Sequence, residues 1–365
     1  LTVGEHSPAL LETMDLLLQL YQVWHADSPA ATLVKAERLI NRMLQIAQTD
    51  DTQYSWVYRK CGNFWFLTGH RKAALPLYQR SLVLCESLLG DKHPNTLKAL
   101  NNVASLYHAQ GDIAKALPLF LRLSGLQEEV HGERHPDVAT SLYNLAILYY
   151  SHGDYAKAEP LYQRALRLRE EVLGERHPQV ADSLHNLAVL YRDQGDYAKA
   201  EPLYERALRL RQEVLGERHP QVAASLNNLA NLYYAQGDYA KGEPLYERAL
   251  RLREEVLGGR HPDVATSLDN LAMLYEAQGR VEQALPMYLR ALQLREEVLG
   301  SNHPDLAFSC NNLGCLYLRQ GQLDRVEELL NRALSIRSQS LPADHPEIAR
   351  VKRNLQLLYS KRSSS

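Results

Sequence analysis

Apolar residues recur at helical spacing along most of this chain. In residues 135–176, for example, Leu142 is followed by Leu145, Ala146 and Tyr149. This i, i+3, i+4, i+7 spacing places the four side chains on one face of an amphipathic helix. A second amphipathic stretch follows in the same segment. Each such segment is therefore expected to hold two helices, called helix A and helix B below.

Proline and glycine mark where these helices begin and end. Pro136 stands where the first turn of helix A should lie, because the N–H that proline lacks has no partner there. Gly153 and Gly174 follow the two apolar stretches, and glycine is favoured just after a helix end. Asp154 is placed to cap helix B. The segment therefore predicts an αα-hairpin, two helices joined by a tight turn.

The same pattern recurs at a fixed interval of 42 residues. His-Pro dipeptides begin at residues 93, 135, 177, 219, 261, 303 and 345. A helix pair cannot bury its apolar face alone, so each pair must stack on its neighbours. We therefore expect one continuous all-α solenoid of antiparallel helix pairs. This replaces the two or three separate domains that 365 residues would otherwise suggest.

The interval divides the chain into an N-terminal helical pair, seven repeats and a C-terminal capping helix. The predicted segments are 1–50, 51–92, 93–134, 135–176, 177–218, 219–260, 261–302, 303–344 and 345–365. Residues 1–50 contain two helical stretches, 9–24 and 30–48, that do not keep the interval. We interpret them as a degenerate repeat or a cap. Residues 345–365 contain only a helix A, which is expected to cover the last apolar face.

Composition and charge narrow the range of functions. The 41 Lys+Arg nearly balance the 43 Asp+Glu, so the chain has no basic field to recruit nucleic acid or an anionic membrane surface. No stretch approaches 18 consecutive apolar residues, so no membrane insertion is expected. The four cysteines form no CxxC pair, which favours a reducing, cytoplasmic location.

The motif N-L-A-x-L-Y-x-x-x-G-D-Y-A-K-A at residues 144–158 resembles the tetratricopeptide repeat (TPR). Ala146, Tyr149 and Ala158 stand at its small and aromatic positions. The 42-residue interval, the G-x-x-H-P linker and the ending L-x-L-R-E-E-V-L-G resemble the kinesin light chain subclass more narrowly. The usual repeat has 34 residues and a Trp where Leu142 stands. The resemblance implies a right-handed superhelix whose A helices line a concave, peptide-binding groove.

One asparagine recurs in the middle of helix A. The copies are Asn102, Asn144, Asn186, Asn228, Asn270, Asn312 and Asn354. Because Asn is a mediocre helix former, its repetition requires a hydrogen-bonding reason. The resemblance implies that the amides line the groove and bond a peptide backbone. The alternative, in which each Asn bonds the backbone of a neighbouring repeat, stays open.

Residues on the same face that differ between repeats are expected to carry specificity. The varying positions are Asn101, Tyr143, His185, Asn227, Asp269 and Asn311; Ser105, Ile147, Val189, Asn231, Met273 and Cys315; and His108, Tyr150, Arg192, Tyr234, Glu276 and Leu318. From these we select Tyr143, His185, Asn227, Tyr150, Arg192, Tyr234 and Asn231 as peptide-binding candidates. Such a mixed face suits a peptide with one or two large apolar anchors and a few charges. An ordinary solvated face is the alternative.

A narrower candidate lies near the N-terminal end. TPR domains that hold a C-terminal carboxylate use a basic residue and an Asn on one helix A, an Asn on the next, and two basic residues on the third. Arg59, Asn63 and Asn102 fit the first three positions of this carboxylate clamp, but Thr140 and Asn144 occupy the last two. The missing cations would leave a carboxylate poorly paired.

The sequence predicts no catalytic residue, no cofactor and no metal site. The seven recurring histidines are each separated by a whole repeat, so they are expected to serve as linkers or N-caps rather than as shared ligands. We find neither a GxxxxGK[ST] loop nor a Ser-His-Asp or Cys-His constellation.

The predicted function is that of a non-enzymatic scaffold, of adaptor or cargo type, which binds a peptide segment of a partner protein in the groove. The alternative is a sensor or regulatory arm of a larger signalling ATPase or protease whose catalytic part lies outside this chain, which the start at Leu1 permits. The partner, the peptide direction, the oligomeric state and any covering of the groove by residues 1–50 are left open.

Overall fold

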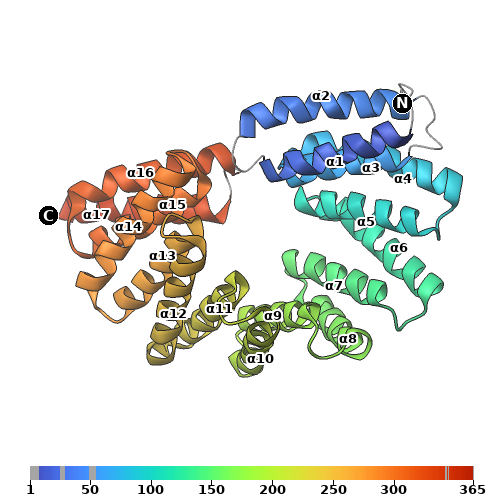
Figure 1. Cartoon of the computed structure of the whole chain (residues 1–365). Coiled ribbons are helices and arrows are strands. Elements are labelled where there is room, and N and C mark those ends of the chain that lie inside the picture. Colours follow the sequence, from blue (N-terminus) through green and yellow to red (C-terminus); the bar gives the residue numbers. More distant parts are fainter. Residues whose placement is uncertain (1–7, 25–28, 49–54, 342, 344, 365) are drawn as a thin grey trace. The chain divides into compact units, whose positions relative to one another are not determined.

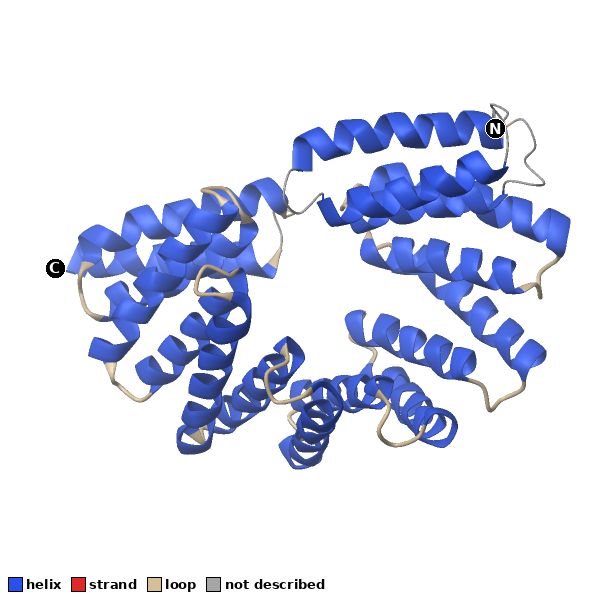
Figure 2. Cartoon of the chain, viewed as in Figure 1, coloured by secondary structure: helices blue, strands red, loops and turns tan. Residues whose placement is uncertain are grey.

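The computed structural model describes residues 8–24, 29–48, 55–341, 343 and 345–364, and within these ranges it contains helices and short connections only (Figures 1 and 2). The predicted all-α fold of stacked helix pairs is confirmed. Residues 1–7, 25–28 and 49–54 belong to the predicted N-terminal pair and first repeat, and they lie outside the described residues.

Seventeen helices are formed by the described part of the chain. They are α1 Pro8–Trp24, α2 Pro29–Ala47, α3 Ser55–Leu67, α4 Arg71–Leu89, α5 Pro94–Ala109, α6 Ile113–His131, α7 Pro136–Ser151, α8 Tyr155–Leu173, α9 Pro178–Asp193, α10 Tyr197–Leu215, α11 Pro220–Gln236, α12 Tyr239–Leu257, α13 Pro262–Ala277, α14 Val281–Leu299, α15 Pro304–Arg319, α16 Leu323–Ser340 and α17 Pro346–Ser364. From α3 onward, odd numbers are A helices and even numbers are B helices.

The chain divides into two compact units, residues 1–175 and 176–365. The division falls within one residue of the predicted boundary between repeats 135–176 and 177–218. In each unit a helix A packs on its own helix B and on the helix B of the preceding repeat, as α5 does on α6 and α4 (Figure 1). The assignment of segment ends, including 1–50 and 345–365, stays a prediction.

The helix ends follow the local chemistry predicted from the sequence. Nδ1 of His135 accepts a hydrogen bond from the backbone N–H of Asp137 at 3.1 Å, so the histidine before helix A is an N-cap. Asp154 accepts from the backbone N–H of Lys157 at 3.3 Å and caps helix B. The ammonium of Lys157 also hydrogen-bonds this carboxylate and lowers its pKa. Gly153 ends helix A with a φ of 80°, where a side chain would be strained.

The core of each unit is built from the positions that repeat. Ala158 and Tyr162 of helix B are buried, and so are Leu142 and Leu145 of helix A. The recurring tyrosine of helix A combines packing with a polar contact: Tyr233 is buried, yet its hydroxyl donates to Glu201 at 2.8 Å. None of the described helices has the length and apolar character needed to cross a membrane.

Candidate functional site

The recurring asparagines connect neighbouring repeats through their side chains. In three pairs, Nδ2 of the recurring Asn donates to the Oδ1 of the residue that precedes the recurring Asn one repeat earlier. The pairs are Asn144 with Asn101 at 3.4 Å in unit 1, and Asn270 with Asn227 and Asn354 with Asn311, both at 2.9 Å, in unit 2. The alternative to peptide binding named a backbone group of the neighbouring repeat, and in these three pairs the bonded group is a side chain. A peptide-binding role for these amides stays a prediction.

The varying position before each recurring Asn lies between helices rather than on an open face. Asn227 and Asn311 are buried and Asp269 has no exposed surface, whereas Tyr143 and His185 are half-buried. These residues therefore face helix B as well as the helix A surface. A bound peptide could therefore contact only the exposed parts of the half-buried side chains at this position.

The two aromatic residues at this position pack on the buried tyrosine of their own helix B. The ring of Tyr143 meets Tyr162 edge-on at 5.9 Å between centroids, and His185 meets Tyr204 in the same way at 5.6 Å. Burial, reinforced by the charge of Arg211, lowers the pKa of His185 to about 4. Nδ1 of His185 has no hydrogen-bond partner among the described residues. This imidazole is therefore neutral at pH 7.

An arginine that recurs in helix B is buried, which the sequence analysis did not predict. In unit 2 it is buried and donates to a serine on helix A of the next repeat. The pairs are Arg211 with Ser225 and Arg253 with Ser267, both at 2.7 Å, and Arg295 with Ser309. The signal was present in the sequence, because both residue types keep the 42-residue interval. Their contact was hidden because they lie 14 residues apart on different helices.

In the repeat 261–302 the buried arginine also meets a buried carboxylate. Arg295 and Asp269 form an ion pair in which the side chains are 4% and 0% exposed. The hydroxyl of Ser309 donates to the same carboxylate at 3.1 Å. Desolvation raises the pKa of Asp269, and the guanidinium of Arg295 opposes that rise. This buried polar cluster connects helices α13, α14 and α15.

Two adjoining pockets open beside the A helices of unit 2. The first, of about 240 Å³, is lined by Arg192, Asn231, Tyr234, Ala235, Tyr246, Asn270 and Met273. The second, of about 270 Å³, is lined by Tyr234, Met273, Glu276, Ala277, Tyr288, Asn311, Asn312, Cys315, Arg319, Arg350 and Asn354. Because Tyr234 and Met273 belong to both, the pockets form one surface, called the pocket pair below. Six residues that were named as groove amides or peptide-binding candidates line it: Arg192, Asn231, Tyr234, Asn270, Asn312 and Asn354.

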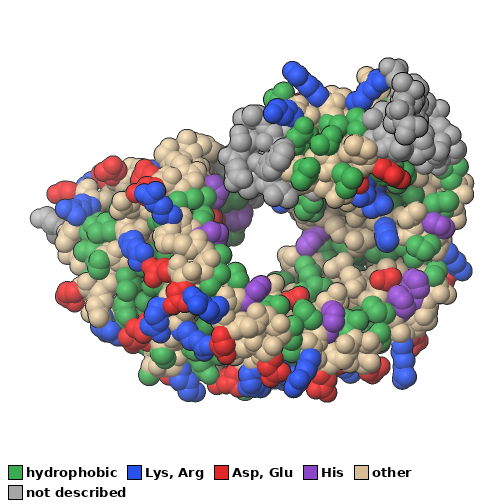
Figure 3. Space-filling view, in the orientation of Figure 1, with side chains coloured by type: hydrophobic (Ala, Val, Ile, Leu, Met, Phe, Trp, Pro, Cys, Tyr) green, Lys and Arg blue, Asp and Glu red, His purple; other side chains and the backbone are tan. Residues whose placement is uncertain are grey.

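The pocket pair offers both apolar surface and unpaired polar groups. Nδ2 of Asn312 is buried and has no hydrogen-bond partner among the described residues. Arg350 is exposed on α17 and makes no ion pair in the described part of the chain, whereas Arg319 pairs with Glu276. Charges of both signs are interspersed over the face drawn in Figure 3. Any recognition of a charged ligand therefore depends on the few charged side chains that line the pockets.

The remaining predicted residues lie elsewhere. Asn228 is half-buried on α11 and does not line the pocket pair, and neither does the buried Asn227. In unit 1, the ring of Tyr150 stacks on Tyr155 at 5.7 Å between centroids. Asn186 is half-buried on α9. A peptide-binding role for these residues stays a prediction.

The residues of the predicted carboxylate clamp come together in unit 1. Arg59, Asn63 and Asn102 line one pocket of about 440 Å³, together with Lys98 and one carboxylate, that of Asp137. Oδ1 of Asn63 accepts from Nδ2 of Asn102 at 3.4 Å. Arg59 and Lys98 make no hydrogen bond or ion pair with a described residue, so both cations are available. Lys98 was not considered in the sequence reading, although it stands four residues before Asn102, one turn along the same helix.

The family model of the tetratricopeptide repeat matches six overlapping stretches of this chain. They are residues 66–124, 97–171, 153–213, 179–241, 221–296 and 269–339. The chain belongs to the tetratricopeptide repeat family. The resemblance seen in the sequence is thus confirmed, and an array of TPR units is typical of scaffolds for protein–protein interaction. No curated protein matches this chain.

Solved structures show that this TPR protein is kinesin light chain-like. BtubC (BKLC) of P. vanneervenii is 27% identical over 63% of this chain and 92% of its own, with a TM-score of 0.56. A Podosopora anserina protein assigned as a kinesin light chain, with nearly identical TPR-like repeats, is 25% identical over 56% of this chain and 97% of its own, with a TM-score of 0.51. Apo RapI, 16% identical over 79% and 99% of the two chains, shares the fold, with a TM-score of 0.57.

Proposed function

We propose that this TPR protein is a non-enzymatic adaptor that binds a peptide segment of a partner protein on the A helices of unit 2. The observation that carries the proposal is the pocket pair, in which Tyr234 and Met273 join two cavities on one surface. A peptide can lie across this junction with apolar side chains in the cavities. Aromatic and methionine side chains are frequent anchors at such interfaces.

The charges around the pocket pair favour an acidic peptide. Arg192, Arg319 and Arg350 line it, against one carboxylate, that of Glu276, which is already paired with Arg319. An acidic side chain of the peptide would find its partner in Arg350. The unpaired Nδ2 of Asn312 would donate to a peptide carbonyl, because a buried donor without a partner costs about 1–3 kcal/mol. The proposed ligand is therefore a segment with one large apolar residue beside Asp or Glu.

The pocket of unit 1 supports a second, smaller contact with an acidic group. Arg59 and Lys98 supply two unpaired cations beside Asn63 and Asn102. We propose that they bind a carboxylate, with Lys98 replacing a cation that the predicted clamp lacks. The four cysteines are free thiols, which supports a reducing, cytoplasmic setting for such an adaptor.

Reversing one charge at the pocket pair should weaken the binding of selected peptides. Peptides are first selected from a displayed random library on the wild-type chain, and their affinity is then measured by fluorescence anisotropy. Arg350→Glu is expected to weaken the acidic peptides more than tenfold, because it replaces attraction by repulsion at the site. Arg350 has no described ion pair, so the variant should keep the stability of the wild type.

Arg353→Glu is the matched control for this experiment. Arg353 is exposed on the same helix, also makes no described ion pair, and does not line the pocket pair. The control carries the same change of net charge and is expected to bind like the wild type. Equal losses in both variants, or none in Arg350→Glu, would contradict binding at the pocket pair.

A further inference from the structure

One repeat has a histidine at a position where other repeats have leucine. His131 stands at the last position of helix B in the repeat 93–134, where the other repeats with the same helix end have leucine. These leucines are Leu89, Leu173, Leu215, Leu257 and Leu299. Leucine therefore satisfies the packing at this position, and His131 adds a polar group that stacking does not require.

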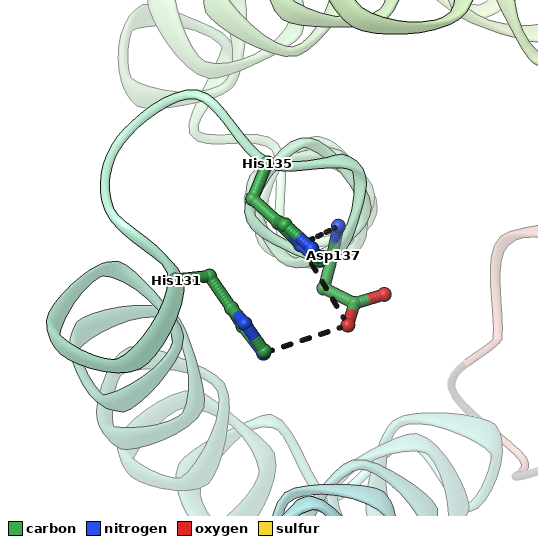
Figure 4. Close-up of side chains that lie close together, drawn as sticks. All are labelled: His131, His135 and Asp137. Carbon is green, nitrogen blue, oxygen red and sulfur yellow. Dashed lines mark hydrogen bonds and ion pairs between the residues drawn. The ribbon is translucent and has the colours of Figure 1, made fainter.

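His131 lies beside the histidine and the aspartate that begin the next helix A. Its ring is stacked on that of His135, with 4.1 Å between centroids and 11° between planes. Oδ2 of Asp137 lies 3.7 Å from Nε2 of His131 and 3.8 Å from Nδ1 of His135 (Figure 4). One potential ligand atom from each residue lies within 4.8 Å of the other two. The three side chains come from α6, the linker and α7.

This set of atoms suits a divalent transition metal. Tetrahedral Zn²⁺ with bonds of about 2.0–2.1 Å holds its ligand atoms about 3.4 Å apart, so small side-chain rotations would close the present distances. Two imidazoles and one carboxylate favour Zn²⁺ and similar ions over Mg²⁺ or Ca²⁺, which prefer oxygen ligands. The side chains of His131, His135 and Asp137 are 23%, 36% and 58% exposed, so an ion can reach them.

We propose that His131, His135 and Asp137 bind one Zn²⁺ ion at the junction of α6 and α7, with the fourth position left for water. Ligation through Nδ1 of His135 would displace the N-cap bond that this nitrogen accepts from the backbone N–H of Asp137. Coordination of the ion by three side chains would replace this one hydrogen bond. The sequence prediction of no metal considered only the recurring histidines, and His131 lies outside that register.

A later repeat contains a similar His-x-Asp pair without the third side chain, and it serves as an internal control for this site. His261 and Asp263 begin helix A of a later repeat, with Nδ1 and Oδ2 3.9 Å apart, nearly the spacing found at His135 and Asp137. Leu257 stands there in place of the third ligand. A substitution at Asp263 therefore tests whether a His-x-Asp pair binds the ion without His131.

The test is a titration of the tag-free, metal-stripped full chain with Zn²⁺, followed by competition with a chromophoric chelator. The wild type is expected to bind one Zn²⁺ ion at this site. His131→Leu and Asp137→Asn should each lower the affinity more than tenfold, because losing a ligand costs at least the 10–100-fold that losing a supporting hydrogen bond to a ligand costs. Both replacements occur naturally in this register, as Leu173 and Asn95, so the variants are expected to fold.

Asp263→Asn is the control and should leave Zn²⁺ binding unchanged. Equal affinity and stoichiometry in the wild type and His131→Leu would overturn the proposal. A loss in Asp263→Asn as large as that in Asp137→Asn would also overturn it, because the ion would then bind at His-Pro linkers in general.

Discussion

Replacing Asp269 with alanine is expected to lower the free energy of unfolding of the chain by about 3 kcal/mol. The change leaves the guanidinium of Arg295 buried without its carboxylate, with Ser309 and Thr266 as the remaining described partners. An uncompensated buried charge costs more than the lost contact itself. Urea-induced unfolding measures the effect, and hydrogen exchange should place the lost protection in α13, α14 and α15, because repeat arrays unfold locally.

Asp269→Asn is the matched control, because the preceding and following repeats have Asn227 and Asn311 at the same position. The amide oxygen can still accept from Arg295, so the loss should be clearly smaller than that of Asp269→Ala. If the alanine variant is as stable as the wild type, the buried ion pair does not hold these three helices together.

Acidification is expected to destabilise unit 2 through His185. The pKa of this imidazole is about 4 in the folded chain and about 6.5 when unfolded. The folded state therefore favours the neutral ring, so the stability is fully present above pH 6.5 and is lost as the pH falls toward 4. A difference of this size corresponds to about 3 kcal/mol between pH 7 and pH 4.

The contribution of His185 is isolated by comparison with His185→Asn. Asparagine is the residue of three other repeats at this position, and it does not titrate. The variant removes the buried imidazole while other titratable groups remain in both chains. The unfolding free energy of the wild type minus that of His185→Asn, measured by urea unfolding at several pH values, should fall by about 3 kcal/mol on acidification. A constant difference would show that His185 is not held neutral by burial.

Much of the fold could be predicted because the same pattern of helix-start and helix-end residues recurs in every 42-residue repeat. The spacing of His-Pro dipeptides and glycines fixes where helices begin and end, as Pro136 and Gly153 do at the two ends of α7. The alternation of helix A and helix B follows from this local chemistry alone. The stacking of pairs follows because neither helix face can be buried within a single repeat.

The site was predicted less completely, because its contacts depend on how helices are rotated against one another. Periodicity placed Asn227 and Asp269 on the helix A face, but it did not show that both side chains are buried beside helix B. The buried Arg295 was overlooked because charged residues of a helix normally lie in solvent. By contrast, Tyr234 and Arg192, chosen because they vary between repeats, do line the pocket pair, and their role in binding a peptide stays a prediction.

The central claim, that a partner peptide binds across the pocket pair, is tested most directly by methyl NMR of the methionines. The chain has four: Met14, Met43, Met273 and Met287. Met273 lines both pockets, whereas Met14 and Met43 are buried in unit 1. Adding a selected acidic peptide should shift the methyl resonance of Met273 and leave those of Met14 and Met43 in place. An unchanged Met273 resonance at saturating peptide would contradict binding at the pocket pair.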